Sequence, residues 1–159
     1  AIVELVDEAG RVEKVVFILR GDGRGLAMVG GFLKVGESAE AGVRREVLEE
    51  TGLTLHTWHQ WCVFTDPERD PRRHTAALVF VGQASAAATP VASDDAKKIA
   101  SFTVAELQRD TPRLAFDHGK IVGAYLARFH PRKGPARRHE PGALAAGSTS
   151  HAPYAACSL

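Results

Sequence analysis

The stretch GFLKVGESAEAGVRREVLEETGL, residues Gly31 to Leu53, decides the fold. Its central part, Ser38 to Thr51, predicts a helix. Ser38 is a typical N-cap residue, and Gly52 is a typical residue to end a helix. Gly30 and Gly31 before the helix allow a close approach of the backbone, which can offer a carbonyl or an N–H group to a ligand.

Three carboxylates lie on one side of this predicted helix. At about 100° per residue, Glu46, Glu49 and Glu50 fall within an arc of roughly 100°. Like charges at this spacing destabilise a helix, and a bound cation relieves the repulsion. Carboxylate oxygens suit Mg²⁺, with Mn²⁺ as a substitute. The three glutamates taken alone also fit a solvated acidic helix face, and the neighbouring Arg45 can hold one of them bidentately.

The complete spacing is more specific than the three glutamates. Gly31, Glu37, the triplet Arg45-Glu46-Val47, the pair Glu49-Glu50 and the pair Gly52-Leu53 occupy every fixed position of the Nudix box, G-x5-E-x7-R-E-U-x-E-E-x-G-U, in which U is aliphatic. The sequence therefore resembles the Nudix hydrolases from Ile2 to about His130. The resemblance implies an α/β Nudix fold, an α/β/α sandwich with a mixed β-sheet, in which the box forms a loop, a helix and a loop.

The resemblance also implies an activity, the hydrolysis of a nucleoside diphosphate linked to another group with water and a divalent metal ion. Carried over to this chain, the metal ligands are Glu46, Glu49, Glu50 and the carbonyl of Gly31. Glu37 and Arg45 brace the loop and orient the helix carboxylates. Metal ions bridge diphosphate oxygens and lower the pKa of a bound water, which a carboxylate then orients or deprotonates.

Family members differ in which carboxylate is the base. Some use a glutamate of the box, and others use an acid on a loop outside it. The candidates outside the box are Asp94 and Asp95, and a solvated turn or a helix cap explains these two residues equally well.

Two further stretches indicate the substrate. Arg69-Asp70-Pro71-Arg72 and Phe116-Asp117-His118 resemble motifs of the ADP-ribose pyrophosphatase branch. That branch splits ADP-ribose to AMP and ribose 5-phosphate. Arg69, Arg72 or Arg73 can contact a phosphate or a ribose, and the alternative is a surface turn with salt bridges. Val29 replaces the proline that many members of the branch carry before the glycine pair.

Three aromatic residues, Trp58, Trp61 and Phe64, can stack on an adenine or belong to the core.

Two other functions stay open besides ADP-ribose hydrolysis. One is a pyrophosphohydrolase of nucleoside triphosphates or oxidised nucleotides. The other is a nucleotide-sensing module that binds without cleavage.

The rest of the chain predicts a few further elements. Strands are expected at 12–19, 53–64 and 75–81, and a loop at 84–93. Thr103 and Glu106 have the pattern of a capping box. A last helix is expected to start at Asp117 and to bury one apolar face.

Charge and composition divide the chain of 159 residues into a Nudix domain, 1–130, and a low-complexity C-terminal tail, 131–159. The tail carries four basic residues and one acid, which leaves 16 basic and 18 acidic residues in the domain. A domain of this charge predicts no nucleic-acid partner.

The sequence also favours a cytoplasmic protein without membrane contact. Its two cysteines have no zinc or disulfide pattern, and no apolar run is long enough to cross a bilayer. The resemblance adds a possible homodimer.

Overall fold

The computed structural model describes residues 1–92 and 96–132. The strands are β1 (Ile2–Val6), β2 (Val12–Arg20), β3 (Leu26–Ala27), β4 (Thr57–Phe64), β5 (Ala77–Ser85) and β6 (Ala96–Phe102). The helices are α1 (Ala39–Thr51), α2 (Val104–Arg109) and α3 (His118–Phe129).

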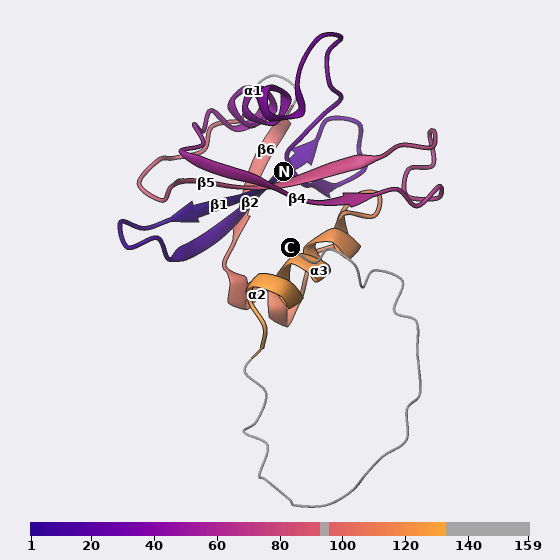
Figure 1. Cartoon of the computed structure of the whole chain (residues 1–159). Helices are drawn as coiled ribbons and strands as arrows, with labels where there is room; N and C mark the ends of the chain where they lie inside the picture. Colours follow the sequence, from indigo (N-terminus) through magenta and orange to yellow (C-terminus); the bar gives the residue numbers. More distant parts are fainter. Residues whose placement is uncertain (93–95, 133–159) are drawn as a thin grey trace, which may run out of the picture.

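The strands form one mixed sheet. β2 pairs antiparallel with β1, β3 and β6, while β1 pairs parallel with β5, and β5 pairs antiparallel with β4. Figure 1 shows α1 on one face of the sheet and α2 and α3 on the other. The predicted α/β/α sandwich with a mixed sheet is therefore confirmed.

Alternate residues of the central strands fill two separate cores, because successive side chains point to opposite faces of a sheet. Ile2 and Phe17 pack in the core that α2 and α3 cover. Val3 and Val16 pack in the other core, with Val47 of α1. The α1 helix is thus anchored by a few apolar residues, which leaves its acidic side available for a site.

Both ends of α1 form as the sequence predicts. The Ser38 hydroxyl accepts a hydrogen bond from the Ala41 N–H at 3.2 Å. Gly52 has a φ of 66°, and its N–H donates to the Leu48 carbonyl. The predicted capping box at α2 is also confirmed, because the side chains of Thr103 and Glu106 each bond the backbone N–H of the other.

The start of α3 differs from the prediction. Asp117 occupies the N-cap position, but its side chain makes no capping hydrogen bond. Its carboxylate instead accepts two hydrogen bonds from Arg69, which is a stronger partner for a buried acid than a backbone N–H. The apolar face of the helix is buried as expected, except that Phe129 is 37% exposed.

Three strands, β1, β3 and β6, were not predicted, and the bounds of β4 and β5 differ from those predicted. All five residues of β1 are buried, so the strand lacks the alternation that marks a half-buried strand. In the predicted strand 53–64, Leu53 and Leu55 precede β4 and pack in the core on the α1 side. β5 extends into the predicted loop because Ala84 pairs with Leu5 of β1.

Several predictions concern residues outside the described part of the chain. Asp94 and Asp95 lie there, as does all of the proposed tail beyond residue 132. The division at residue 130 therefore stays a prediction. Within residues 1–92 and 96–132, no helix is both long and apolar enough to cross a bilayer.

Candidate functional site

The site begins with the guanidinium of Arg45, which gathers the loop before α1. Its Nε donates to Oε1 of Glu37 at 2.6 Å, and its Nη2 donates to Oε2 of the same carboxylate at 2.9 Å. Oε2 also accepts from the Lys34 N–H at 3.0 Å. These contacts lower the pKa of Glu37 to about 2, the Arg45 hydrogen bonds being the largest cause. Glu37 and Arg45 therefore have the bracing arrangement that the resemblance implies.

The same guanidinium also holds two carboxylates of α1. Nη1 donates to Glu46 Oε1 at 2.7 Å and to Glu49 Oε2 at 2.8 Å. The ammonium of Lys34 lies 3.6 Å from the other oxygen of Glu49. The hydrogen bond from Arg45 is the main cause that lowers the pKa of Glu49. Arg45 thus brings three carboxylates of the box together.

Glu50 faces the glycine pair. Its Oε2 accepts a hydrogen bond from the Gly30 N–H at 2.8 Å. Burial raises the pKa of Glu50 to about 6, the Gly30 hydrogen bond lowers it in part, and the charge of Glu46 raises it further. The carboxylates of Glu46 and Glu50 are therefore near enough to repel each other.

Gly31 leaves the space that Glu46 occupies. A Cβ atom at Gly31 would lie 2.7 Å from the carboxyl carbon of Glu46 and 2.8 Å from its Oε2. Gly31 is not among the described glycines with positive φ, so steric contact rather than backbone conformation requires a glycine here. The backbone of the loop and a carboxylate of the helix are in direct contact.

The carboxylate oxygens fit a hard divalent cation, although Arg45 and the Gly30 N–H hydrogen-bond to them in this structure. Among residues 1–92 and 96–132, no three His, Cys, Asp or Glu side chains are arranged as a metal cluster. Arg45 and the Gly30 N–H take up oxygens that an ion would need. Oxygen donors and mutual repulsion nevertheless favour a cation of the Mg²⁺ type. The assignment of Gly31, Glu46, Glu49 and Glu50 as ligands stays a prediction.

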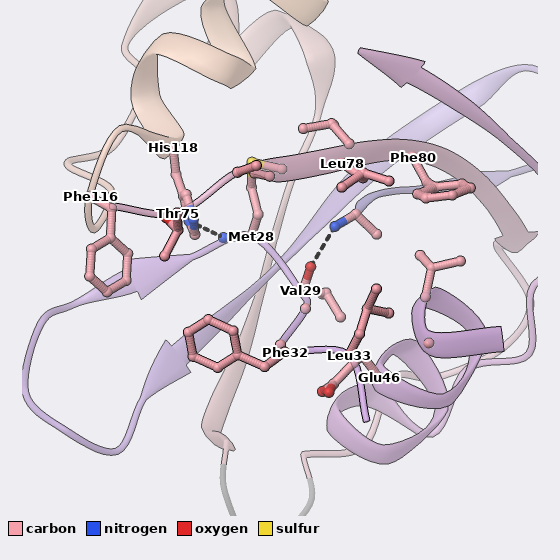
Figure 2. A pocket seen from close by; sticks show the side chains of 18 of the residues that line it. Met28, Val29, Phe32, Leu33, Glu46, Thr75, Leu78, Phe80, Phe116 and His118 are labelled. Atoms are coloured by element: carbon pink, nitrogen blue, oxygen red, sulfur yellow. Dashed lines mark hydrogen bonds between the residues drawn. The ribbon is translucent and has the colours of Figure 1, made fainter. Parts of the chain in front are cut away.

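A cavity of about 700 Å³ opens beside this cluster. Gly31, Arg45 and Glu46 line one part of it, and Phe116 and His118 line another. In Figure 2 the ring of Phe32 lies between Phe116 and Glu46. The volume is within the range of small-molecule sites, and it joins the carboxylates to an aromatic end.

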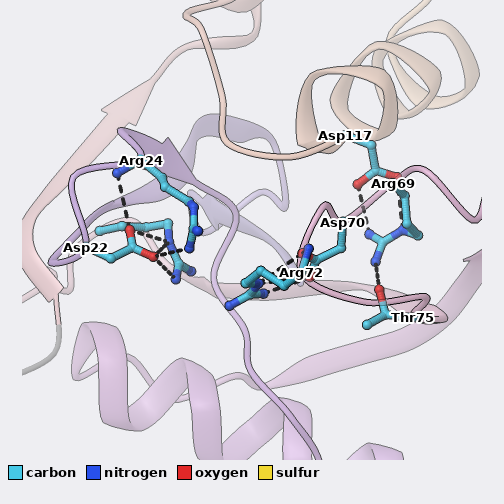
Figure 3. Close-up of polar contacts among 8 residues, drawn as sticks. Asp22, Arg24, Arg69, Asp70, Arg72, Thr75 and Asp117 are labelled. Carbon is cyan, nitrogen blue, oxygen red and sulfur yellow. Dashed lines mark hydrogen bonds and ion pairs between the residues drawn. The ribbon is translucent and has the colours of Figure 1, made fainter.

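Two of the three predicted substrate arginines form an ion pair with an aspartate. Arg69 donates to Asp117 at 2.8 Å and to Thr75 Oγ1 at 2.9 Å (Figure 3), and both ionic side chains are less than 10% exposed. This pair fixes the turn before β5 to the start of α3. Arg72 donates to both oxygens of Asp70, at 2.9 Å and 2.8 Å, and these bonds lower the pKa of Asp70 to about 2.

Arg72 and Arg73 both face an aromatic ring. The guanidinium carbon of Arg73 lies 4.8 Å from the centre of the Phe32 ring. Arg69 and Arg72 line the cavity, and Arg73 is not among its lining residues. The structure therefore brings Arg69 and Arg72 to the site and leaves Arg73 at its edge.

The aromatic residues of the site were not predicted from the sequence. Phe32 and Phe116 line the cavity, whereas Trp58, Trp61 and Phe64 do not. Trp61 and Phe64 pack in the core that α3 covers, and Trp58 stacks against Arg44. A signal existed, since Phe32 follows the box glycine and Phe116 begins the Phe-Asp-His motif.

The NUDIX domain family model matches residues 1–125. The chain belongs to the Nudix family. An ADP-ribose pyrophosphatase of Methanocaldococcus jannaschii is 40% identical over 100 residues, which are 63% of this chain and 56% of that protein. This Nudix chain thus spans little more than half the length of that relative.

Solved structures share the fold. The NUDIX domain of Shewanella oneidensis NrtR, complexed with ADP ribose, has a TM-score of 0.64 at 22% identity and covers 79% of this chain and 85% of that chain. A mutT/nudix family protein of Listeria innocua has a TM-score of 0.58 at 29% identity and covers 79% of this chain and 89% of that chain. Shewanella oneidensis NrtR has also been solved with a 27mer DNA.

Proposed function

We propose that the chain hydrolyses the diphosphate of a nucleoside diphosphate derivative, with ADP-ribose as the substrate and AMP and ribose 5-phosphate as the products. Mg²⁺ is the proposed metal, and Mn²⁺ is its substitute. The proposal rests on one observation. The carboxylates that Arg45 holds, those of Glu37, Glu46 and Glu49, lie beside a cavity of about 700 Å³ that has aromatic side chains at its other end. A diphosphate and a base need these two kinds of surface.

Arg45 and the glutamates have different roles in the proposed reaction. Arg45 holds Glu46 and Glu49 through one nitrogen and Glu37 through two others, so the carboxylates are oriented before substrate arrives. A bound divalent cation supplies charge for the diphosphate oxygens and acidifies a water. Glu46, Glu49 and Glu50 would hold that cation with Gly31, and one carboxylate near it accepts the proton of the attacking water.

The relatives support the choice of substrate. The Methanocaldococcus jannaschii relative is named an ADP-ribose pyrophosphatase, and the NrtR NUDIX domain was crystallised with ADP ribose. The cytoplasmic location and the homodimer belong to the same proposal, and so does the absence of nucleic acid from the partners.

A substrate panel tests the proposal. The purified chain is incubated with Mg²⁺ and, in turn, ADP-ribose, nucleoside triphosphates, an oxidised nucleotide and other nucleotide sugars, and the products are separated by ion-exchange chromatography. We expect AMP and ribose 5-phosphate in equal amounts from ADP-ribose, and the loss of both on chelation of the metal.

The other outcomes identify the alternatives. Cleavage of a nucleoside triphosphate without release of AMP from ADP-ribose would contradict the substrate assignment. It would favour a pyrophosphohydrolase of nucleoside triphosphates or oxidised nucleotides. Tight binding of ADP-ribose without cleavage of any compound in the presence of Mg²⁺ or Mn²⁺ would contradict the enzymatic reading and favour a sensing module.

A further inference from the structure

Three arginine side chains gather around the ring of Phe116 at the cavity. The guanidinium carbons of Arg72, Arg20 and Arg24 lie 4.8 Å, 5.2 Å and 5.7 Å from the centre of that ring. They come from two separate segments, the end of β2 with the turn that follows it, and the loop before β5. Like charges repel at such distances, so a structure that collects three of them needs compensating anions.

Two aspartates compensate part of this charge (Figure 3). Asp22 accepts from Arg20 Nη2 at 2.7 Å and from Arg24 Nη1 at 2.9 Å, and Asp70 accepts from Arg72 Nη2 at 2.8 Å. The hydrogen bond to Asp70, and to a lesser extent the charge of Asp22, raises the pKa of Arg72, so the two groups of charges are close to each other. Three guanidinium groups thus face two carboxylates, and one positive charge is left over.

Each of the three guanidinium groups also keeps a spare donor. Arg20 and Arg72 use Nε and Nη2 for their aspartates, and Arg24 uses Nη1. Within residues 1–92 and 96–132, the remaining Nη nitrogen of each arginine makes no hydrogen bond. The side chains of Arg20, Arg24 and Arg72 are 24%, 43% and 36% exposed, so a ligand can reach them. Surplus positive charge with spare donors suits a phosphate monoester, which carries up to two charges and three acceptor oxygens.

The diphosphate of the proposed substrate does not need these arginines. Its oxygens are assigned to the cation that Glu46, Glu49 and Glu50 would hold, and the base is assigned to the aromatic end of the cavity. The ribose of the nucleoside joins these two parts, and its 2′ and 3′ hydroxyls are positions at which a nucleotide carries a further phosphate. Arg20 and Arg72 line the cavity together with Phe116, where such a phosphate would lie.

We propose that Arg20, Arg24 and Arg72 form a subsite for a phosphate monoester on the ribose of the nucleoside, so that the chain accepts nucleoside diphosphate derivatives with a 2′- or 3′-phosphate. This inference rests on the proposed function and adds a substrate class to it. Hydrogen bonds between a guanidinium group and a phosphate are charge-assisted and therefore strong. The subsite acts on binding and takes no part in the cleavage of the diphosphate.

Isomers that differ in the place of their second phosphate test the subsite. ADP, adenosine 2′,5′-bisphosphate and adenosine 3′,5′-bisphosphate contain the same atoms, and only the last two carry a phosphate at the 2′ or 3′ position. Binding is measured by isothermal titration calorimetry with Mg²⁺ present, on the wild type, Arg24→Gln and Arg11→Gln. Arg11 is the matched control, because it pairs with Asp7 at 2.7 Å beside the turn between β1 and β2 and does not line the cavity.

We expect Arg24→Gln to weaken the binding of at least one of the two bisphosphates by about tenfold, the loss of one charge-assisted hydrogen bond. ADP binding stays as in the wild type, and Arg11→Gln binds all three isomers as the wild type does. The bisphosphate that responds identifies the position of the phosphate.

Three results would overturn the inference. The first is wild-type affinity of Arg24→Gln for both bisphosphates. The second is an equal weakening of ADP, because the arginine would then act on the 5′ end of the nucleotide. The third is an equal loss in Arg11→Gln, because the effect would then come from the overall charge of the protein.

A second measurement uses the wild-type chain alone. The second pKa of a phosphate monoester is about 6, and neighbouring guanidinium groups favour its dianion. Phosphorus NMR of the bound bisphosphate should therefore show its ribose phosphate titrating at a lower pH than in the free ligand, and an unchanged titration would overturn the subsite. Neither measurement needs cleavage. Binding that depends on Arg24 without hydrolysis of ADP-ribose would refute the proposed substrate and leave the phosphate subsite in place.

Discussion

Replacement of Gly31 by alanine tests the contact between the box loop and α1. The new Cβ would lie 2.7 Å from the carboxyl carbon of Glu46 and 2.8 Å from its Oε2. Non-bonded carbon atoms in contact are about 3.5 Å or more apart, so the carboxylate must move away by roughly 1 Å. It then loses its 2.7 Å hydrogen bond from Arg45. A misplacement of about 1 Å at a catalytic group costs on the order of 100-fold in rate.

The assay compares kcat/KM for ADP-ribose with Mg²⁺ and the Tm from circular dichroism. We expect Gly31→Ala to lose about 100-fold in kcat/KM. Its Tm is expected near that of the wild type, because Gly31 is not among the described glycines with positive φ and the displaced group is the end of a flexible side chain. The matched control is Gly123→Ala in α3, where an added Cβ meets no atom within 4 Å.

Two results would refute this reasoning. Retention of kcat/KM within about threefold of the wild type would show that the Glu46 position does not matter to the reaction. A large fall in Tm that accounts for the lost activity would show that Gly31 serves stability instead.

Three further perturbations concern stability, and each is measured by chemical denaturation. Asp117→Asn leaves the buried guanidinium of Arg69 without its charge partner and is expected to cost about 3 kcal/mol, whereas no loss would contradict the structural role of the pair. Burial lowers the pKa of His118 from 6.5 to about 3, so the unfolded chain binds an extra proton between these values. The free energy of unfolding should then fall as the pH falls through that window, by about 2 kcal/mol between pH 7 and pH 5. His118→Asn should reduce this slope, and an unchanged slope would contradict the assignment. Gly52→Ala should cost about 1 kcal/mol because φ is 66°, and an equal or higher stability would contradict the C-cap conformation.

The parts predicted correctly are those whose signal is local. The helix from Ser38 to Gly52 carries its own caps, and the capping box at Thr103 lies within four residues. The contacts of Arg45 with Glu37, Glu46 and Glu49 also lie within one short stretch. Spacing along a loop and a helix is enough to place these side chains together.

The parts that were missed depend on distant pairings. β1 is recognisable as a strand only through its pairing with β2 and β5. Its buried Glu4 likewise has a distant partner, Tyr125 of α3, whose hydroxyl donates to the carboxylate at 2.5 Å. The Phe32 and Phe116 rings converge only because the sheet brings their loops together. From the sequence, Trp58 could equally stack on a base or belong to the core. In the structure it packs against the core on the α1 side, and the guanidinium carbon of Arg44 lies 4.8 Å from its ring centre.

The central claim is that the carboxylates of α1 perform the hydrolysis, and replacement of one of them tests it most directly. Glu49→Gln is compared with the wild type and with Glu40→Gln, an exposed glutamate in the first turn of the same helix. The measurement is the rate of AMP release from ADP-ribose with saturating Mg²⁺. We predict that Glu49→Gln loses about 100-fold or more while Glu40→Gln keeps the wild-type rate. Equal turnover by all three proteins would contradict the account.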